Sequence, residues 1–250
     1  MQEKLTIWIP TKDRPLFLLR VLEYYKNTRF KGCIFIGDSS KDKNLELNRE
    51  SIKKFNNTLK ISYFEFPDLN QGYVSAELVP KIKTEFSTLL GDDDIIVTSS
   101  IEPCIKFLIE NEKISGVNGN AIIFNVESGE AFGNLDGLMN YPLAKITNPI
   151  GYERLKNIYS NMKNMNMCIH RTANQKIVFE KVKQLPKFHS QYQFEEMIGS
   201  AIMSIRGDVA QLPILFLCRQ SHPNQNYHSF SIYEWFTDKD WNIAYRALEQ

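Results

Sequence analysis

The sequence predicts an α/β protein whose central sheet is mostly parallel and is covered by helices on both faces. In the first half of the chain, short apolar segments alternate with amphipathic segments of helical period, as in repeated strand–helix units. The first apolar segment, Lys4–Ile9, is rich in β-branched residues, as expected of a buried parallel strand. The 250 residues show no internal repeat, low-complexity linker or break in composition, so we predict a single domain.

The elements of the first half follow in order. Pro10 ends the strand Lys4–Ile9, and a helix follows from Pro15 to about Lys26. Pro is favoured at the first helical position, and Asp13 is the expected N-cap. A later helix contains Pro80, which must kink or split it. The remaining elements are strands at Gly32–Ile36, Lys60–Phe66, Phe86–Gly91 and Gly116–Phe124, and helices around Leu45–Phe55, Tyr73–Glu85 and Ile101–Asn111.

Four polar loops each follow one of these strands. Because the carboxyl ends of parallel strands meet at one edge of a sheet, we expect the four loops to converge there. In open α/β sheets this edge is where ligands bind. The loops are Thr11–Arg14, Asp38–Ser40, Asn70–Gly72 and Asp92–Asp94.

The second half of the chain is less regular. The clearest element is a helix at Gln191–Ile205, whose apolar residues recur at helical spacing and which Gly207 ends. Val209–Leu217 is typical of a strand interrupted at Pro213, which we place at an edge of the sheet. The other expectations are a turn at Glu127–Glu130, a loop over Gly133–Pro149, helices at Tyr152–Met162 and Lys176–Val182, and a strand at Met167–Arg171.

Composition excludes several classes of protein. The net charge is +1, from 30 basic and 29 acidic residues, which argues against a dedicated nucleic-acid binder. Four scattered cysteines without a CxxC pair indicate reduced thiols and neither disulfides nor a zinc site. The N-terminus passes directly into a strand without a signal peptide, and no apolar run approaches the roughly 18 residues of a membrane span. We therefore expect a soluble, cytoplasmic protein.

Three adjacent carboxylates, Asp92–Asp94, follow the strand that ends at Gly91. Such acids repel one another unless a cation neutralises them, and hard oxygen ligands suit Mg²⁺ or Mn²⁺. The alternative is a solvated acidic turn capping the helix near Glu102, since acids stabilise a helix N-terminus. The position at the carboxyl end of a strand favours a metal site.

Five short motifs occur along the chain in a particular order. They are Ile-Trp-Ile-Pro-Thr-Lys-Asp-Arg-Pro at residues 7–15, Ile-Gly-Asp-Ser-Ser at 36–40, Asn-Gln-Gly at 70–72, Leu-Gly-Asp-Asp-Asp at 90–94 and Glu-Glu at 195–196. In the same order they resemble the IPTYNRP strand and turn, the DDGS loop, the N-x-G turn, the DxD site and the ED pair of family 2 glycosyltransferases. The agreement spans roughly residues 4 to 220.

The resemblance implies a glycosyltransferase that uses a nucleotide sugar. The implied fold is GT-A, a Rossmann-like three-layer sandwich, with a nucleotide-sugar-binding half at residues 1–125 and an acceptor and catalytic-base half at 126–250. The resemblance favours inversion, because a single displacement needs one base and no enzyme nucleophile. It implies a UDP-sugar as the expected donor, a glycan or glycolipid as the acceptor, and a setting in bacterial surface-glycan assembly, in the cytoplasm or at the inner face of the membrane.

The resemblance also assigns roles to residues. Asp94 is the implied direct ligand of Mn²⁺ or Mg²⁺, and Asp92 and His222 are further candidates for the metal. The departing diphosphate gains negative charge that the cation would neutralise. The implied nucleotide-sugar-binding residues are Pro10, Thr11, Asp13, Arg14, Asp38, Gly72, Asp92, Asp93 and, by its charge, Arg219.

The displacement also needs a base that takes the proton of the acceptor hydroxyl. Glu195 and Glu196 are the candidates, and the family pattern favours Glu196 because the second acid of the pair is the usual base. Adjacent helical residues point about 100° apart, so the two cannot face the sugar equally. The helical wheel places Glu195 beside the apolar face and Glu196 nearer the opposite side, which favours Glu195. We predict Glu196 as the base, with Glu195 as the second candidate. The alternative for both is that they stabilise the helix N-terminus.

The C-terminal segment is rich in aromatic residues. We interpret it as a helix packed on the domain, with docking on a membrane surface or a partner protein as the alternative. The residues are Tyr233, Trp235, Phe236, Trp241 and Tyr245.

Three other functions remain as alternatives. A sugar-nucleotidyltransferase would need a glycine-rich phosphate loop after the first strand, and Thr11–Arg14 contains no glycine. A phosphohydrolase with a DxD nucleophile would carry its acids after the first strand, whereas here they follow the fourth. An inactive sugar-binding or scaffolding relative need not keep both the triple aspartate and the Glu195-Glu196 pair, and this sequence has both.

Overall fold

A computed structural model of the chain describes residues 1–160, 165–184, 191–223, 225, 237 and 246, with the side chains of residues 191–194 excluded. The aromatic residues of the C-terminal segment lie outside the described residues. Among the described residues, no helix combines the length and the apolar character needed to cross a membrane.

Four parallel strands form one half of the sheet, in the order β3-β2-β1-β4. Helices connect successive strands, as the alternating sequence pattern predicted. The strands are β1 (Leu5–Thr11), β2 (Cys33–Asp38), β3 (Lys60–Glu65) and β4 (Phe86–Leu89), and the helices between them are α1 (Pro15–Asn27), α2 (Asp42–Phe55) and α3 (Gln71–Leu78).

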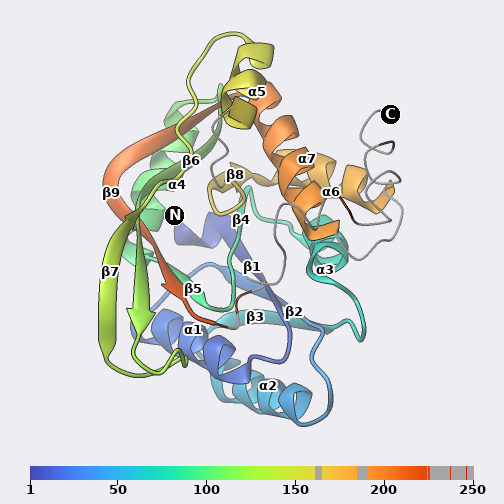
Figure 1. Ribbon diagram of the computed structural model, residues 1–250, viewed down its shortest axis with the longest axis vertical. Coiled ribbons are helices and arrows are strands. Elements are labelled where there is room, and N and C mark those ends of the chain that lie inside the picture. Colours follow the sequence, from blue (N-terminus) through green and yellow to red (C-terminus); the bar gives the residue numbers. More distant parts are fainter. Residues whose placement is uncertain (161–164, 185–190, 224, 226–236, 238–245, 247–250) are drawn as a thin grey trace.

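The rest of the sheet continues from β4 in the order β8-β6-β9-β5, with β7 paired to β6. β8 is antiparallel to both β4 and β6, whereas β9 is parallel to β6 and antiparallel to β5. Figure 1 shows β7, β6 and β9 running together along one side of the molecule. The strands are β5 (Asp94–Ile96), β6 (Ile114–Val126), β7 (Leu135–Tyr141), β8 (Ile169–Arg171) and β9 (Asp208–Ser221).

Two expectations for the second half were wrong. β9 is not an edge strand, because it lies between β6 and β5. Its proline, Pro213, is tolerated because the register with β6 shifts between Asn118 and Asn120, which leaves Pro213 outside the ladder. β7 occupies part of the segment expected to be a loop, and it pairs with β6 as a hairpin.

Helices cover both faces of the sheet and make three layers. β1 alternates between the two apolar clusters, since Leu5, Ile7 and Ile9 belong to one cluster and Trp8 belongs to the other. The first cluster contains α1, α2 and α4, and the second contains α3, α5, α6 and α7. The helices not yet bounded are α4 (Thr98–Glu110), α5 (Gly151–Ser160), α6 (Thr172–Gln184) and α7 (Gln191–Arg206).

The helix boundaries have local causes. Asp13 is not the N-cap of α1, because Arg14 holds that position and makes no side-chain cap. Asp13 has a positive φ of 55°, and its Oδ1 instead accepts hydrogen bonds from Lys41 N and Asn44 Nδ2 at the start of α2. As predicted, Pro80 splits the third helical segment, since α3 ends at Leu78 and a short 3-10 turn, Val79–Lys81, follows.

Candidate active site

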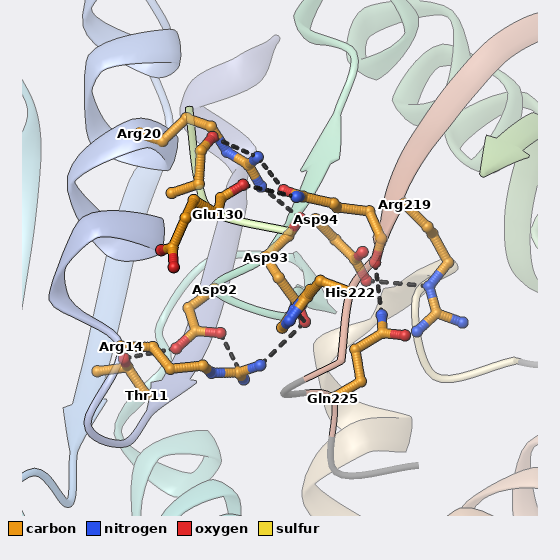
Figure 2. Close-up of polar contacts among 12 residues, drawn as sticks. Thr11, Arg14, Arg20, Asp92, Asp93, Asp94, Glu130, Arg219, His222 and Gln225 are labelled. Atoms are coloured by element: carbon orange, nitrogen blue, oxygen red, sulfur yellow. Dashed lines mark hydrogen bonds and ion pairs between the residues drawn. The ribbon is translucent and has the colours of Figure 1, made fainter. Parts of the chain in front are cut away.

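The loop after β1 and the loop between β4 and β5 are joined by short polar contacts. Thr11 Oγ1 donates to Asp92 Oδ2 at 2.6 Å. The Arg14 guanidinium lies 2.6 Å from Asp92 Oδ1 and 3.0 Å from Asp93 Oδ2, so one arginine bridges two carboxylates. Figure 2 shows these side chains pointing toward one another. The predicted convergence of these two loops is therefore present.

Asp92–Asp94 are buried, at 0%, 6% and 0% exposure respectively. This excludes the solvated acidic turn considered from the sequence, because a solvated turn would expose its carboxylates. Buried charges require partners. Burial raises the pKa values of Asp92 and Asp94, although nearby arginines oppose this rise. The pKa of Asp93 is lowered, because His222 and Arg14 together outweigh the effect of burial.

Arg219 is the partner of Asp94. The two residues lie opposite each other in the antiparallel pairing of β5 and β9, and Arg219 Nε donates to Asp94 Oδ2 at 3.1 Å. Arg219 Nη1 also donates to Tyr141 Oη at 2.6 Å, and the guanidinium lies 4.8 Å from the centre of the Tyr141 ring. Burial lowers the pKa of Arg219, but Asp94, Tyr141 and Asp93 together outweigh burial, so the pKa is raised and the guanidinium stays charged.

His222 lies next to Asp93 and not next to Asp94. Its Nε2 is 3.0 Å from Asp93 Oδ2, and its ring stacks on Phe17 with centroids 4.5 Å apart. His222 Nδ1 is buried without a hydrogen-bond partner in the described part of the chain. The structure thus brings this candidate metal ligand to the acidic loop.

Arg20 is a residue of the site that the sequence analysis did not single out. Its Nη2 donates to the main-chain oxygen of Asp93 at 2.6 Å, and its Nη1 donates to Ala131 O and to the side-chain oxygen of Gln220. Arg20 therefore ties the acidic loop to the β6–β7 turn and to the end of β9. Tyr141 was missed as well, because its strand was not predicted. Nothing in the local pattern around either residue marks it, since both act through pairings distant in sequence.

The loop after β2 is hydrogen-bonded to the loop after β1. Ser39 N donates to Thr11 O at 2.9 Å, and Asp13 N donates to Ser40 Oγ at 2.7 Å. Asp38 is 1% exposed. Its buried carboxylate accepts from three donors, which hold it within this part of the protein. The donors are Ser40 N at 2.7 Å, Asn48 Nδ2 at 2.8 Å and Tyr63 Oη at 2.7 Å.

Gly72, in the first turn of α3, lies against Glu195 in the second turn of α7. A Cβ placed on Gly72 would coincide with the Glu195 carboxyl group, so glycine is what leaves room for that group. Glu195 is buried, and its Oε1 has no hydrogen-bond partner among the described residues. Burial raises the pKa of Glu195 to about 8.

Glu196 is partly buried and has a charged neighbour. Burial raises its pKa, and the positive charge of Arg219 opposes that rise. The negative charge of Glu196 also contributes to raising the pKa of Tyr141. The charge of Arg219, the partner of Asp94, therefore acts on Glu196 and not on Glu195.

The residues fit a divalent cation bound together with a phosphate ligand. Among the described residues, no three His, Cys, Asp or Glu side chains converge as a complete protein cage would require. Mg²⁺, however, is usually held by one or two carboxylates, waters and substrate phosphates. Asp94 Oδ1 is a buried carboxylate oxygen without a hydrogen-bond partner in the described part of the chain, and is available as such a ligand.

The three-layer architecture, with acidic residues at the carboxyl end of β4, is the GT-A fold implied by the motifs. No protein-family model and no curated protein matches this chain. Solved structures do match its fold. The S. aureus TarS 1-349 structure in complex with UDP-GlcNAc has a TM-score of 0.63 and 13% identity, over 91% of this chain and 61% of that one.

The second similar structure is a mannosyltransferase, PcManGT from Pyrobaculum calidifontis, in complex with GDP-Man and Mn2+. Its TM-score is 0.57 at 11% identity, over 99% of this chain and 64% of that one. This chain thus spans less than two thirds of the length of either protein. Identities at this level establish the fold and leave the function to the site.

Proposed function

We propose that this protein is a glycosyltransferase that moves a sugar from a nucleotide-sugar donor to an acceptor hydroxyl. The observation that carries the proposal is the buried run Asp92–Asp94, with Arg14 and Arg219 beside it and one oxygen of Asp94 free. Cationic side chains and a carboxylate-held cation are what a diphosphate requires. The ligands of the two similar structures, UDP-GlcNAc and GDP-Man, support this class of donor.

The nucleoside and diphosphate are assigned to the loops of the first half. Pro10 and Thr11 end β1 at the carboxyl edge, and Asp13 and Arg14 follow in the loop. Asp38 would act by holding the adjacent loop, because its carboxylate already has three donors. Gly72 would act by leaving space for Glu195. Asp92 and Asp93 would orient Arg14 toward the donor through the ion pairs described above.

The cation is assigned to Asp94, with Asp92 and His222 as neighbouring candidates. When bound, Mn²⁺ or Mg²⁺ would neutralise the negative charge that gathers on the departing diphosphate. The Mn2+ in the mannosyltransferase structure supports a divalent metal. Arg219 supplies a second positive charge beside Asp94.

The acceptor hydroxyl is assigned to Glu196 as the base. Glu196 is partly buried, which raises its pKa, and the positive charge of Arg219 opposes that rise. An ionised carboxylate can take the hydroxyl proton as the acceptor oxygen attacks the sugar. A single base of this kind supports an inverting displacement. Glu195 lacks that charged neighbour, and burial favours its protonated form.

The finer parts of the proposal concern substrates and setting. We propose a UDP-sugar donor, which the UDP-GlcNAc complex of TarS supports. The acceptor would be a glycan or glycolipid in bacterial surface-glycan assembly, reached from the cytoplasm or the inner face of the membrane. Peripheral docking through the C-terminal aromatic segment belongs to the same proposal, as does the single-domain organisation.

Binding of the donor provides the first test. Thermal unfolding of the parent should be measured with UDP, GDP, UDP-GlcNAc and GDP-Man, each with and without Mn²⁺. A ligand at 100 times its Kd stabilises the protein by about 2.7 kcal/mol, which is readily detected. Asp94→Asn should retain the fold and lose the enhancement by Mn²⁺, because it removes the charge of the proposed ligand.

The control is Asp136→Asn, which removes an exposed carboxylate on β7 and should keep the parental response. An unchanged Mn²⁺ enhancement in Asp94→Asn would contradict the metal assignment. Absence of stabilisation by every nucleotide, with and without Mn²⁺, would contradict the donor assignment as well.

A further inference from the structure

Arg219 has two anchors. Its Nε donates to Asp94 Oδ2, and its Nη1 donates to the Tyr141 hydroxyl, whose ring also lies beneath the guanidinium. Asp94 is completely buried, whereas the Arg219 side chain is 21% exposed. One end of this ion pair is therefore fixed in the interior, and the other reaches solvent.

The acidic loop is neutralised by the protein itself. Arg14 pairs with Asp92 and Asp93, and Arg219 pairs with Asp94. Arg20 adds a third guanidinium at the main chain of Asp93. Two guanidinium groups thus pair with the three carboxylates, and the third lies at the main chain. A divalent cation arriving at Asp94 Oδ1 meets a positive charge already bound to Oδ2. Two cations on one carboxylate repel each other, so the arginine and the metal compete for Asp94.

We propose that Arg219 is an exchangeable counter-ion, which holds Asp94 while the site lacks a donor and yields it to the divalent cation when a diphosphate accepts the guanidinium. This inference rests on the proposed function. Tyr141 makes the exchange local, because its hydroxyl and ring hold Arg219 independently of Asp94. A bidentate guanidinium suits the oxygen atoms of a diphosphate.

The exchange predicts a coupling between two ligands. The metal alone must displace Arg219 without compensation, and the diphosphate alone must draw Arg219 from a carboxylate that is then left unpaired. Each ligand removes the obstacle to the other, so each should tighten the other by the same factor. Removing the arginine should abolish that reciprocity.

The test measures Mn²⁺ alone, UDP or GDP alone, and both together. Free Mn²⁺ is followed by electron paramagnetic resonance, and nucleotide binding by calorimetry. Arg219→Gln should bind Mn²⁺ alone about tenfold more tightly than the parent and bind the nucleotide alone more weakly, with a coupling factor near one. Arg206→Gln removes an exposed arginine of α7 and should match the parent in all three measurements.

Each outcome is decisive. The inference is overturned if Arg219→Gln binds Mn²⁺ no more tightly than the parent, or keeps the parental coupling factor. If the parent itself binds neither UDP nor GDP under any condition, the proposed function fails and the inference fails with it. Nucleotide-dependent metal binding in the parent together with an unaffected Arg219→Gln variant would overturn the inference alone.

A measurement on the parent protects the test against a variant that does not fold. The Nε–H signal of Arg219 should be followed by nuclear magnetic resonance with Mg²⁺, with UDP and with both. It should shift strongly only with both ligands. Arg154, whose Nε donates to Ser204 O at 2.6 Å within the contact of α5 and α7, serves as the internal reference and should not shift. A static Arg219 signal in the presence of both bound ligands would overturn the exchange.

Discussion

Glu195 and Glu196 are neighbours at the start of α7, yet their carboxyl groups have different surroundings. Side chains of adjacent helical residues diverge by about 100°, and the Glu195 carboxyl group lies on Gly72, whereas the charge of Arg219 acts on the pKa of Glu196. The first is buried without a charged partner and the second is partly neutralised. This asymmetry supports different roles for two residues of the same type.

The first residue-scale prediction concerns stability against pH. The pKa of Glu195 is raised from an ordinary 4.5 to about 8 by burial. Between these values the folded protein holds a proton that the unfolded chain has released, so stability falls as the pH rises from about 4.5 to 8. Glu195→Gln keeps the shape and remains neutral. Its stability relative to the parent should therefore rise with pH, by as much as a few kcal/mol at pH 9.

Urea unfolding at pH 5, 7 and 9 measures this difference. Glu112→Gln, which changes an exposed glutamate after α4, provides the control and should track the parent at every pH. If Glu195→Gln changes the free energy of unfolding equally at pH 5 and pH 9, Glu195 does not titrate as a buried acid without a partner.

At the scale of elements, the first turn of α3 meets α7 at Glu195. The meeting depends on Gly72, because the Glu195 carboxyl group fills the position that a Cβ would take. Asn70 precedes α3 as its N-cap, and its side chain accepts from Tyr73 N at 3.2 Å. The turn that resembles the N-x-G motif thus combines a cap with a space for a carboxyl group.

Gly72→Ala should displace Glu195, since the obstructing atoms are at the flexible end of its side chain. We expect a loss of about 1–3 kcal/mol at pH 5, the usual range for overpacking. In a Glu195→Ala background the space is free, so the same substitution should cost much less. Urea unfolding of the four proteins gives the coupling between the two sites.

Gly137→Ala in β7 is the matched control, because a Cβ there would make only an ordinary contact with Asn125 at 3.4 Å. Additive effects of Gly72→Ala and Glu195→Ala would show that the two residues do not share this space.

Some elements could be predicted from the sequence because their signals are local. β1 to β3 contain runs of apolar or β-branched residues, and β1 and β2 each precede a helix of clear period. β5 and β7 carry no such signal. β5 has three residues and is defined by its pairing with β9, and most side chains of β7 are exposed, so its pattern does not alternate. Such strands are specified by pairing partners distant in sequence.

The same distinction holds for the site. Thr11, Arg14 and Asp92 lie in loops whose positions follow from the alternation of strands and helices, and the structure joins them. The contact of Arg219 with Asp94 depends on the register of β5 against β9, which no local pattern fixes. His222 was predicted as a candidate metal ligand. Its contact with Asp93 depends on the end of β9 packing against Phe17 of α1, which no local pattern specifies.

At the scale of the whole molecule, the site lies where the parallel half of the sheet meets its mixed half. The parallel strands β1 and β2 contribute loops at their carboxyl ends, while β9 and α7 bring Arg219 and Glu196 from the last part of the chain. Residues about 100 or more positions apart in sequence are thereby placed around Asp94. The proposed reaction needs both parts, since the donor loops belong to the first part, and Arg219 and the base belong to the second.

The last prediction separates an enzyme from a protein that only binds nucleotide sugars. Glu196→Gln keeps size and shape but cannot accept the proton of the acceptor hydroxyl. Donor affinity in the presence of Mn²⁺ should hardly change, because the donor loops belong to the first half of the chain. Sugar transfer should fall by about 10²–10⁴-fold, the usual contribution of a positioned base. Glu195→Gln should have a much smaller effect.

Transfer rate and donor affinity are measured for both variants and for the parent, with a panel of glycan and glycolipid acceptors. If both variants transfer at the parental rate, the base lies elsewhere and the likeness to an ED pair is misleading. If Glu195→Gln is the more damaging, the two roles are exchanged, as the helical wheel had suggested. A parent that binds donor with Mn²⁺ and transfers to no acceptor would favour the binding protein, since the same Asp94 site can hold a nucleotide sugar without a functional base.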